Sequence, residues 1–188
     1  MDDLQVGVPT LNPDLAVTGD TREAAFARFF ESRLADHYRI ASVILGDPVE
    51  AQDATHDAIA QAWRGRSDLR DLERLDAWVG RILVNECRDR MRRRRRRPVT
   101  DISDEVSGLL AAPDQLKAAA DRDEIGRAFA VLNPDQQIAV ALRFYADLTV
   151  DQIADRVGAP AGTVKSRLHH AMAAMNAELV RARPGGLR

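Results

Sequence analysis

The stretch Thr149–Ala171 constrains the fold of this chain more than any other segment, because it encodes two short helices around a tight turn. Thr149, followed three residues later by Gln152, forms a capping box that starts the first helix. Gly158 suits the positive φ angle that ends this helix, and Pro160 stands where the second helix can begin. The stretch therefore predicts a helix-turn-helix.

The second helix of this pair has an apolar side and a polar side. The positions expected to pack inward recur at helical spacing and are Val164, Leu168, Ala171, Met172 and Met175. The side chains left outward or on the flanks are Thr163, Lys165, Ser166, Arg167, His169 and His170. Such a polar face fits the major groove of duplex DNA. An ordinary helical hairpin with a solvated polar face has the same spacing, so both interpretations stay open at this point.

Length and composition indicate a soluble globular protein. A chain of 188 residues holds one medium domain or two small ones. No apolar run approaches the ~18 residues of a membrane span, and the acidic start lacks the basic region of a secretory signal. We therefore expect a cytoplasmic protein without membrane insertion. The single Cys87 excludes an internal disulfide, and the scattered histidines have no zinc-ligand spacing, so no metal or cofactor is expected.

Hydrophobic periodicity predicts an all-α fold of two small helical domains joined by a flexible acidic linker, with the helix-turn-helix in the C-terminal domain. The expected boundaries are a disordered tail over 1–19, a first domain over 20–97, a linker over 98–117 and a second domain over 118–182. Because the linker is acidic and contains helix breakers, we expect the two halves to have separate cores and to fold independently.

Five further helices are expected, and the one that starts the second domain is marked by Ile125, Phe129 and Leu132. The other four have the following predicted inner faces. The first helix, for which one break near Ala35 is considered, would bury Phe26, Phe29, Phe30, Leu34, Tyr38, Ala41 and Leu45. The helix opened by Asp47-Pro48 would bury Ala51, Ala54, Ala58, Ile59, Ala62 and Trp63. A long helix over about 72–95 would bury Leu75, Val79, Ile82, Leu83 and Cys87. The helix capped by Asn133 would bury Ile138, Ala141, Leu142 and Tyr145.

The net charge of −2 hides a strongly basic block over Arg81–Arg97 beside an acidic one over Pro98–Glu124.

Within the long helix, one stripe combines an aromatic, an amide and cationic side chains, namely Trp78, Arg81, Asn85, Arg88 and Arg92. Guanidinium groups bind phosphates, Asn85 can pair with a base edge, and the Trp78 ring can stack on a base. A core position for Trp78 and a solvated arginine face are an equally good interpretation of one helix alone. The arginine run over 92–97 favours a polyanion partner, because these charges repel one another.

The helix after Asp47 carries an acidic stripe of Glu50, Asp53 and Asp57, with no basic partner on the same helix until Arg64. An unpaired acidic stripe is either solvated surface or a face that docks on a partner. Composition alone favours solvated surface.

Three segments resemble the extracytoplasmic-function (ECF) sigma factors, the small two-domain members of the bacterial sigma-70 family. The recognition helix of their promoter-binding domain is similar to GTVKSRLHHA. Their helix that binds the clamp coiled coil of the polymerase largest subunit is similar to AQDATHDAIAQAW. The third similar segment is LDAWVGRILVNECRDRMRRR, and the three occur in the family's order and spacing.

This resemblance implies that the chain directs promoter recognition, DNA melting and transcription initiation, with core RNA polymerase, promoter DNA and an anti-sigma factor as partners. It implies core-polymerase contacts for Glu50, Asp53, His56 and Asp57. It also implies that the Arg66–Arg74 loop and Asn85 read the melted minus-ten element, and that minus-thirty-five bases are read by Lys165, Ser166, His169 and His170. The chain departs from the family at His56, at Ala54-Thr55 and at His169-His170, so the promoter sequence does not carry over.

Two other functions fit the sequence less well. A stand-alone helix-turn-helix DNA-binding regulator would explain the C-terminal half, but it would leave the acidic stripe and the arginine stripe without a role. An enzyme is disfavoured, because the histidines have no nucleophile or metal partner within a motif and the chain has no phosphate-binding glycine loop. No catalytic residue is therefore predicted.

Overall fold

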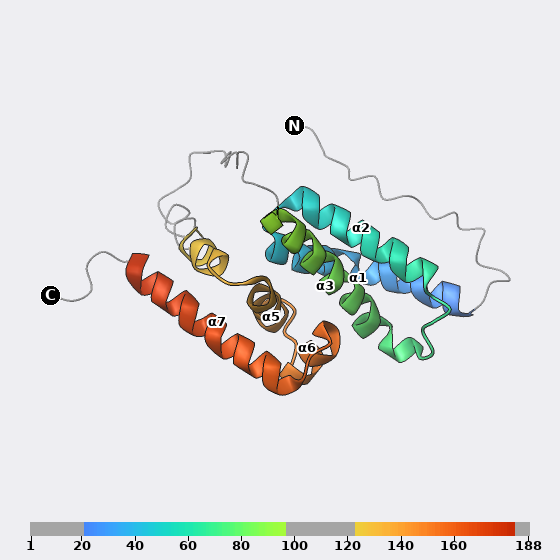
Figure 1. Cartoon of the computed structure of the whole chain (residues 1–188). Helices are drawn as coiled ribbons and strands as arrows, with labels where there is room; N and C mark the ends of the chain where they lie inside the picture. The colour runs from blue at the N-terminus through green and yellow to red at the C-terminus, as the bar shows by residue number, and fades with distance from the viewer. Residues whose placement is uncertain (1–20, 97–122, 183–188) are drawn as a thin grey trace.

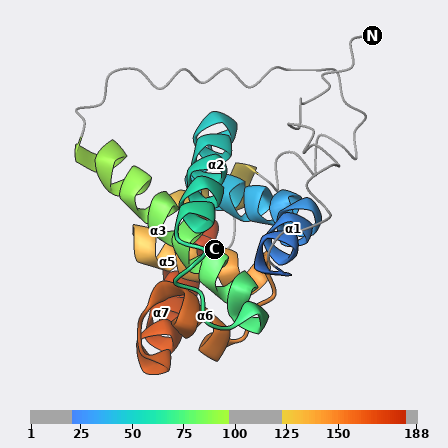
Figure 2. The ribbon, with the colours of Figure 1, turned by 90° about the vertical axis from the view of Figure 1, so that its right-hand side faces the viewer.

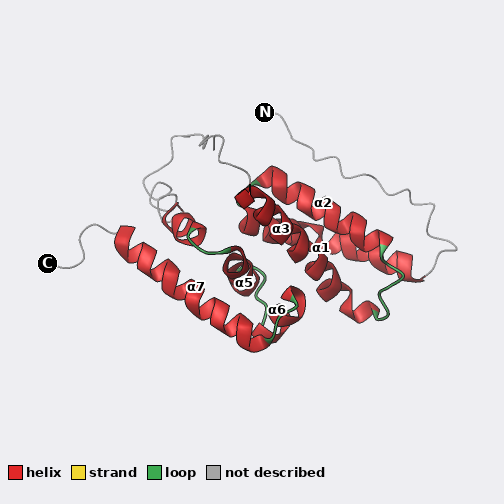
Figure 3. Cartoon of the chain, in the orientation of Figure 1, coloured by secondary structure: helices red, strands yellow, loops and turns green. Residues whose placement is uncertain are grey.

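The computed structural model describes residues 21–96 and 123–182, and every regular element in this part of the chain is helical (Figure 3). The first half contains α1 (Thr21–Leu45), α2 (Pro48–Arg64), the short 3-10 helix η2 (Leu72–Arg74) and α3 (Leu75–Arg96). The second half contains a helical stretch over 123–130, followed by α5 (Pro134–Phe144), α6 (Val150–Val157) and α7 (Ala161–Ala182). The predicted tail, and the linker over 98–117, lie outside the described residues.

In the first half, α1, α2 and α3 pack against one another (Figure 1). The side chain of Asp47 caps α2 by accepting hydrogen bonds from the backbone amides of Val49 and Glu50, as the Asp-Pro start predicts. The helix α1 runs unbroken, so the expected break near Ala35 does not occur. Its buried stripe also differs from the prediction, because Tyr38 is 37% exposed whereas Ile40 and Ile44 are buried.

In the second half, α5, α6 and the start of α7 form the predicted helix-turn-helix and the helix before it (Figure 2). Both Asn133 and Thr149 make complete capping boxes, and Gly158 ends α6 with a φ angle of 66°. Two predicted core positions are wrong, because Tyr145 is 63% exposed and Met172 is 46% exposed. Tyr145 is the C-cap residue at the end of α5, and Met172 lies beside the buried Ala171 at the edge of the apolar arc of α7.

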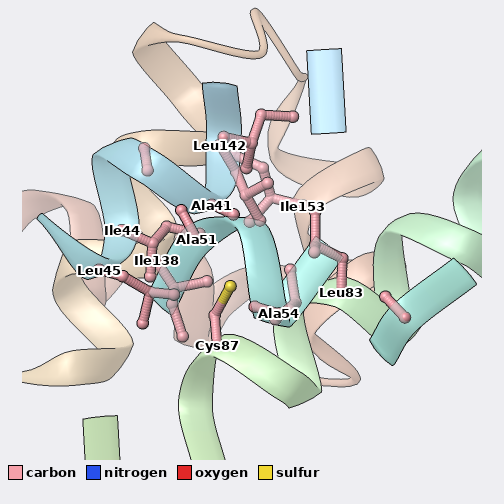
Figure 4. Packing of buried hydrophobic residues seen from close by; sticks show 14 of the residues in the cluster. Ala41, Ile44, Leu45, Ala51, Ala54, Leu83, Cys87, Ile138, Leu142 and Ile153 are labelled. Carbon is pink, nitrogen blue, oxygen red and sulfur yellow. The ribbon is translucent and has the colours of Figure 1, made fainter. Parts of the chain in front are cut away.

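One hydrophobic cluster joins the two halves, which the sequence analysis did not expect. Figure 4 shows Ile138 of α5 beside Ile44 and Leu45 of α1, with Cys87 of α3 close by. The buried members of this cluster from the first half are Ile40, Ala41, Ile44, Leu45, Ala51, Ala54, Ala58, Leu83, Val84 and Cys87, and those from the second half are Ile138, Ala141, Leu142, Ile153 and Val164. The expectation of separate cores is therefore wrong for the described residues.

The shared cluster explains why α3 is buried on more sides than its periodicity predicts. The expected residues Val79, Leu83 and Cys87 are buried, but so are Gly80 and Val84. Gly80, Val84 and Arg88 follow one another at four-residue spacing and therefore lie on one stripe of the helix. This stripe faces the second half, because Gly80 lies against Arg156 of α6 and Arg88 forms an ion pair with Asp135 of α5.

We predict that Ile138→Ala lowers the free energy of unfolding by about 2–5 kcal/mol, because the fully buried side chain would leave a cavity in the shared cluster. Val131→Ala is the matched control, since Val131 is 51% exposed. Urea denaturation followed by circular dichroism measures both changes. A loss for Ile138→Ala as small as that for Val131→Ala would contradict the burial of Ile138.

Candidate functional site: three polar helix faces

The helix α7 presents the polar face that its sequence predicts. Val164 and Ala171 are fully buried. The predicted DNA-binding residues that are exposed on this helix are Thr163, Lys165, Ser166, His169 and His170. The rings of His169 and His170 contact each other edge to face, with centroids 5.5 Å apart. Arg167 differs from the others, because its side chain is only 26% exposed and forms an ion pair with Asp135.

The predicted minus-ten stripe on α3 is only partly free. Arg81, Asn85 and Arg92 are exposed, whereas the side chain of Arg88 is 14% exposed. Arg88 donates one hydrogen bond to Asn85 Oδ1 over 3.1 Å and forms an ion pair with Asp135 Oδ1 over 3.2 Å. The structure therefore brings Asn85 and Arg88 together and links them to α5.

Trp78 packs in the first half instead of standing free. Its ring lies edge to face with Phe26, at a centroid distance of 6.1 Å, and it contacts a second hydrophobic cluster that includes Phe26, Ala62 and Leu69. This position corresponds to the core interpretation that the sequence left open. A stacking role for the Trp78 ring has no support in this geometry.

The segment Arg66–Arg74, which contains the loop after α2 and the helix η2, is held by ion pairs at both of its ends. Arg66 forms an ion pair with Glu23 over 3.1 Å, and its guanidinium carbon lies 4.5 Å from the centre of the Trp63 ring. At the other end, Arg74 forms an ion pair with Asp155 of α6. The predicted minus-ten loop therefore borders the second half of the chain.

The acidic face of α2 has a cationic neighbour that the sequence analysis missed. Arg90 of α3 contacts Glu50 at 3.3 Å, Asp57 at 2.5 Å and Glu86 at 2.9 Å. Burial opposes the charge on Arg90, but the hydrogen bonds that its guanidinium donates to Asp57 and Glu86 outweigh this effect and raise its pKa. Glu50 and Asp57 are therefore not unpaired, and that expectation is wrong.

Asp53 and His56 differ from their acidic neighbours on this face. Both are exposed, and neither makes an ion pair with another residue in the described part of the chain. The four predicted core-polymerase residues, Glu50, Asp53, His56 and Asp57, nevertheless all remain on the exposed side of α2. The face is thus accessible, with its free negative charge concentrated at Asp53.

Sequence periodicity gave no sign of two charged residues that organise the centre of the molecule. Arg156 occupies a buried position on α6 and pairs with Asp76 at the start of α3. Asp135, in the first turn of α5, pairs with one arginine from each half. The one available signal was Gly80, because an isolated glycine inside a helical pattern indicates a close approach by another group.

The described residues contain no group of three or more histidine, cysteine or acidic side chains arranged to hold a metal ion. Their helices also include none that is long and apolar enough to cross a membrane. The candidate residues lie on three polar surfaces, on α2, α3 and α7.

Comparison with known proteins agrees with this arrangement. The family model of Sigma-70 region 2 matches residues 29–97, which contain most of the first half. The family model of Sigma-70, region 4 matches residues 122–175, which contain the helix-turn-helix. The first match contains the polar surfaces on α2 and α3, and the second contains the polar surface on α7.

Curated relatives align along most of the chain. The ECF RNA polymerase sigma factor SigL of Mycobacterium tuberculosis is 32% identical over 161 residues, which cover 84% of this chain and 90% of SigL. The RNA polymerase sigma-E factor of Streptomyces coelicolor is 30% identical over 155 residues, covering 82% of this chain and 86% of that protein.

Two solved structures share the fold. One is the sigma factor RpoE in complex with the anti-sigma factor NepR from Bartonella quintana, with a TM-score of 0.63 at 22% identity over 84% of this chain and 98% of RpoE. The other is CnrH in complex with the cytosolic domain of CnrY, with a TM-score of 0.60 at 19% identity over 86% of this chain and 91% of CnrH.

The helix-turn-helix and the three-helix first half, with the sequence matches to regions 2 and 4, place the chain in the sigma-70 family. Within that family it belongs to the ECF sigma factors. It is an alternative RNA polymerase sigma factor, which acts with core RNA polymerase at promoter DNA. Nothing in its sequence or fold favours a stand-alone regulator.

The thiol of Cys87 is buried in the hydrophobic cluster that joins the two halves, and it is therefore unreactive. Burial raises the pKa of its thiol to about 12, so the reactive thiolate is scarce at pH 8. We predict that a thiol reagent at pH 8 labels the native protein only slowly and labels the urea-unfolded chain at once. A spectrophotometric thiol assay checks this, and rapid labelling of the native chain would show that Cys87 is accessible.

Proposed function

We propose that the three polar surfaces divide the work of promoter recognition. The acidic face of α2 binds core RNA polymerase, the α3 face with the Arg66–Arg74 loop binds the minus-ten element, and α7 reads the minus-thirty-five element. The observation that carries this proposal is that each surface is exposed and chemically distinct, while the buried stripe of the same helix fixes its position.

The α7 surface suits duplex DNA. The buried side chain of Val164 fixes which way the helix faces, and Ser166 and His170 then point outward from the body of the domain. Hydroxyl and imidazole groups can donate to and accept from base edges in the major groove. Lys165 and His169 border the same surface, whereas Thr163 and Arg167 are suited to phosphates.

The α3 surface suits a melted strand. Asn85 offers an amide that pairs with an exposed base edge, and Arg88 and Arg92 offer guanidinium groups to the backbone. Base-specific capture of a strand requires the base to leave its stack, which costs a few kcal/mol. A rigid helix reduces the further cost of ordering the protein side of such a contact.

The α2 surface suits a basic or polar partner face. Glu50, Asp53 and Asp57 are exposed, and Arg90 fixes the carboxylates of Glu50 and Asp57 from behind. This pairing limits the rotamers of those two side chains, so less conformational entropy is lost when a partner binds.

Three further statements belong to this proposal. The chain works by binding and not by catalysis, as sigma factors do, and it resides in the cytoplasm, where the polymerase is. An anti-sigma factor is a further partner, supported by the structural neighbour RpoE, a sigma factor that is bound to the anti-sigma factor NepR.

Transcription in vitro tests the proposed function directly. Purified chain and core polymerase are incubated with a fragment library of genomic DNA, and the transcript starts are sequenced. The proposal requires start sites that depend on the chain and share two elements at the spacing of minus ten and minus thirty-five. Transcripts that are the same without the chain would contradict it.

We predict that Asp53→Arg weakens binding to core polymerase by on the order of fivefold, because it replaces the unpaired carboxylate with the opposite charge. Asp57 is unsuitable for this test, since its reversal would also break the contact with Arg90. Glu31→Arg is the matched control, because Glu31 is an exposed acid on α1. Fluorescence anisotropy with core polymerase measures both, and equal affinities would remove Asp53 from the docking face.

We predict that Asn85→Ala lowers open-complex formation and relaxes the base preference at one minus-ten position, because its amide reads a base edge. Arg92→Ala is the comparison variant. It should weaken binding at all promoters alike and make the salt dependence shallower, as expected for a phosphate contact. Permanganate footprinting on promoter variants measures strand opening. An unchanged base preference in Asn85→Ala would rule out the base-reading role.

We predict that Ser166→Ala and His170→Ala each change the preferred minus-thirty-five sequence, with a loss of about 1–3 kcal/mol at the base that is no longer read. Thr163→Ala should instead lose affinity on all sequences alike, because it removes a phosphate contact. Selection of randomised minus-thirty-five DNA by the holoenzyme distinguishes these results. If the first two variants select the parent sequence, α7 positions the domain without reading bases.

A further inference from the structure

A buried histidine lies in the core of the first half, away from the three polar surfaces. His37 of α1 is only 5% exposed, although an imidazole takes up a proton close to neutral pH. Its ring lies edge to face with that of Phe29, at a centroid distance of 5.6 Å. The packing of the first half therefore depends on which protonation state this ring adopts.

The surroundings of the ring select its neutral form. Nδ1 of His37 lies 2.9 Å from the backbone oxygen of Arg33. Because a carbonyl oxygen only accepts hydrogen bonds, Nδ1 carries the proton of the neutral ring and Nε2 carries the lone pair. Nε2 is buried and has no hydrogen-bond partner among the residues that the structure describes. A second proton on the ring would therefore create a buried N–H donor that none of these residues is placed to accept.

The space beside the ring is too small to hydrate such a charge. His37 lines a cavity of about 10 Å³, which lies between α1, α2 and α3. The other polar residue in the lining is Thr55, whose hydroxyl donates to the backbone oxygen of Ala51 over 2.7 Å. One water molecule at most fits a volume of this size, and it does not replace the hydration shell of an ion.

The charged groups that act on the ring are already paired. Asp76 at the start of α3 favours the charged ring, but it forms an ion pair with Arg156 of α6, whose own charge opposes that of the ring. Asp36, on the same helix as the histidine, pairs with Arg33 and Arg39. The residues of α2 that line the cavity are uncharged. A proton on the ring therefore meets no free carboxylate in this part of the molecule.

This environment makes the fold sensitive to acid. Burial lowers the pKa of His37 below its usual value of 6.5, against the opposing effects of the Arg33 carbonyl and the Asp76 carboxylate. The unfolded chain exposes the imidazole to water and keeps the usual pKa. As the pH falls below about 6.5, the unfolded chain takes up a proton that the folded chain rejects, so the folded state loses stability. One proton changes the unfolding equilibrium constant by at most about tenfold per pH unit.

We propose that His37 is an acid-sensitive switch in the core of this sigma factor, which loosens the packing of α1 on α2 and α3 as the pH falls and so shortens the lifetime of the free chain. The open form is the one that proteases cleave. The switch itself follows from the packing of the first half. Only one consequence rests on the proposed function, namely that core polymerase bound to α2 protects the folded form by mass action.

The test is urea denaturation of the full chain, followed by circular dichroism from about pH 7.5 to about pH 5.5. His37→Phe keeps an aromatic ring in the core, and His37→Asn keeps a donor for the Arg33 carbonyl, but neither side chain takes up a proton. Below about pH 6.5 the unfolding equilibrium constant of the parent should rise by up to about tenfold per pH unit relative to both variants. His56→Asn is the matched control, because His56 is exposed on α2. It should keep the pH dependence of the parent.

Two further measurements use the same proteins. An NMR titration of the histidine ring protons should show the His37 signal titrating below about pH 6.5, and its absence from either His37 variant assigns it. Limited proteolysis of the parent and of His37→Phe at each pH measures the open fraction. Because the protease is equally active on both proteins at a given pH, their ratio of cleavage rates should rise in acid by the same factor as the ratio of unfolding constants.

Two results would overturn the inference. A His37 signal that titrates at or above about pH 6.5 would show that the core accepts the charged ring. Equal pH dependence of unfolding in the parent and in both His37 variants would show that another group sets the acid sensitivity. Failure of the proposed function is a separate result, because it would appear as no chain-dependent transcription with core polymerase and would leave these measurements unchanged.

Discussion

The packing of α3 on two sides is the constraint on which the rest of this structure depends. Its Val79, Leu83 and Cys87 side faces α1 and α2, and its Gly80, Val84 and Arg88 side faces α5 and α6. A helix buried on two sides keeps only narrow strips for polar side chains. The polar stripe of Arg81, Asn85 and Arg92 therefore runs along the border between the halves, and its accessibility depends on how far apart they lie.

Basic residues of α3 form ion pairs with acidic residues that lie close to them in the folded chain. Arg90 is surrounded by three carboxylates although it belongs to the arginine-rich helix. The contacts with Glu50 and Asp57 hold this side chain of α3 against α2, whereas Glu86 lies on α3 itself. Arg92–Arg96 are exposed and keep a positive end on the molecule, although Arg95 also donates a hydrogen bond to the backbone oxygen of Leu132. A near-neutral chain can thus present separate basic and acidic surfaces to different partners.

Local signals predicted the helices well, because capping residues and apolar periodicity act within a few residues. Asn133 and Thr149 start α5 and α6, and Gly158 ends α6, as their chemistry requires. The relation between the halves had no such signal. Arg156 follows the polar pattern of a surface helix, and only the notch at Gly80, distant in sequence, makes it a buried residue. The polar faces of α2 and α7 were predictable for the same local reason, whereas the pairing of Glu50 and Asp57 with Arg90 depends on tertiary packing.

Asp135 couples the two halves energetically, because it pairs with one arginine from each half. Because one carboxylate serves both Arg88 and Arg167, removing either arginine leaves the whole carboxylate to the other. Substitutions at these two positions are then not additive, even though Arg88 lies on α3 and Arg167 on α7. Under the proposed function, a change that retunes one promoter element also alters the balance at the other. Compensating changes in both halves are then the shortest route to a new promoter.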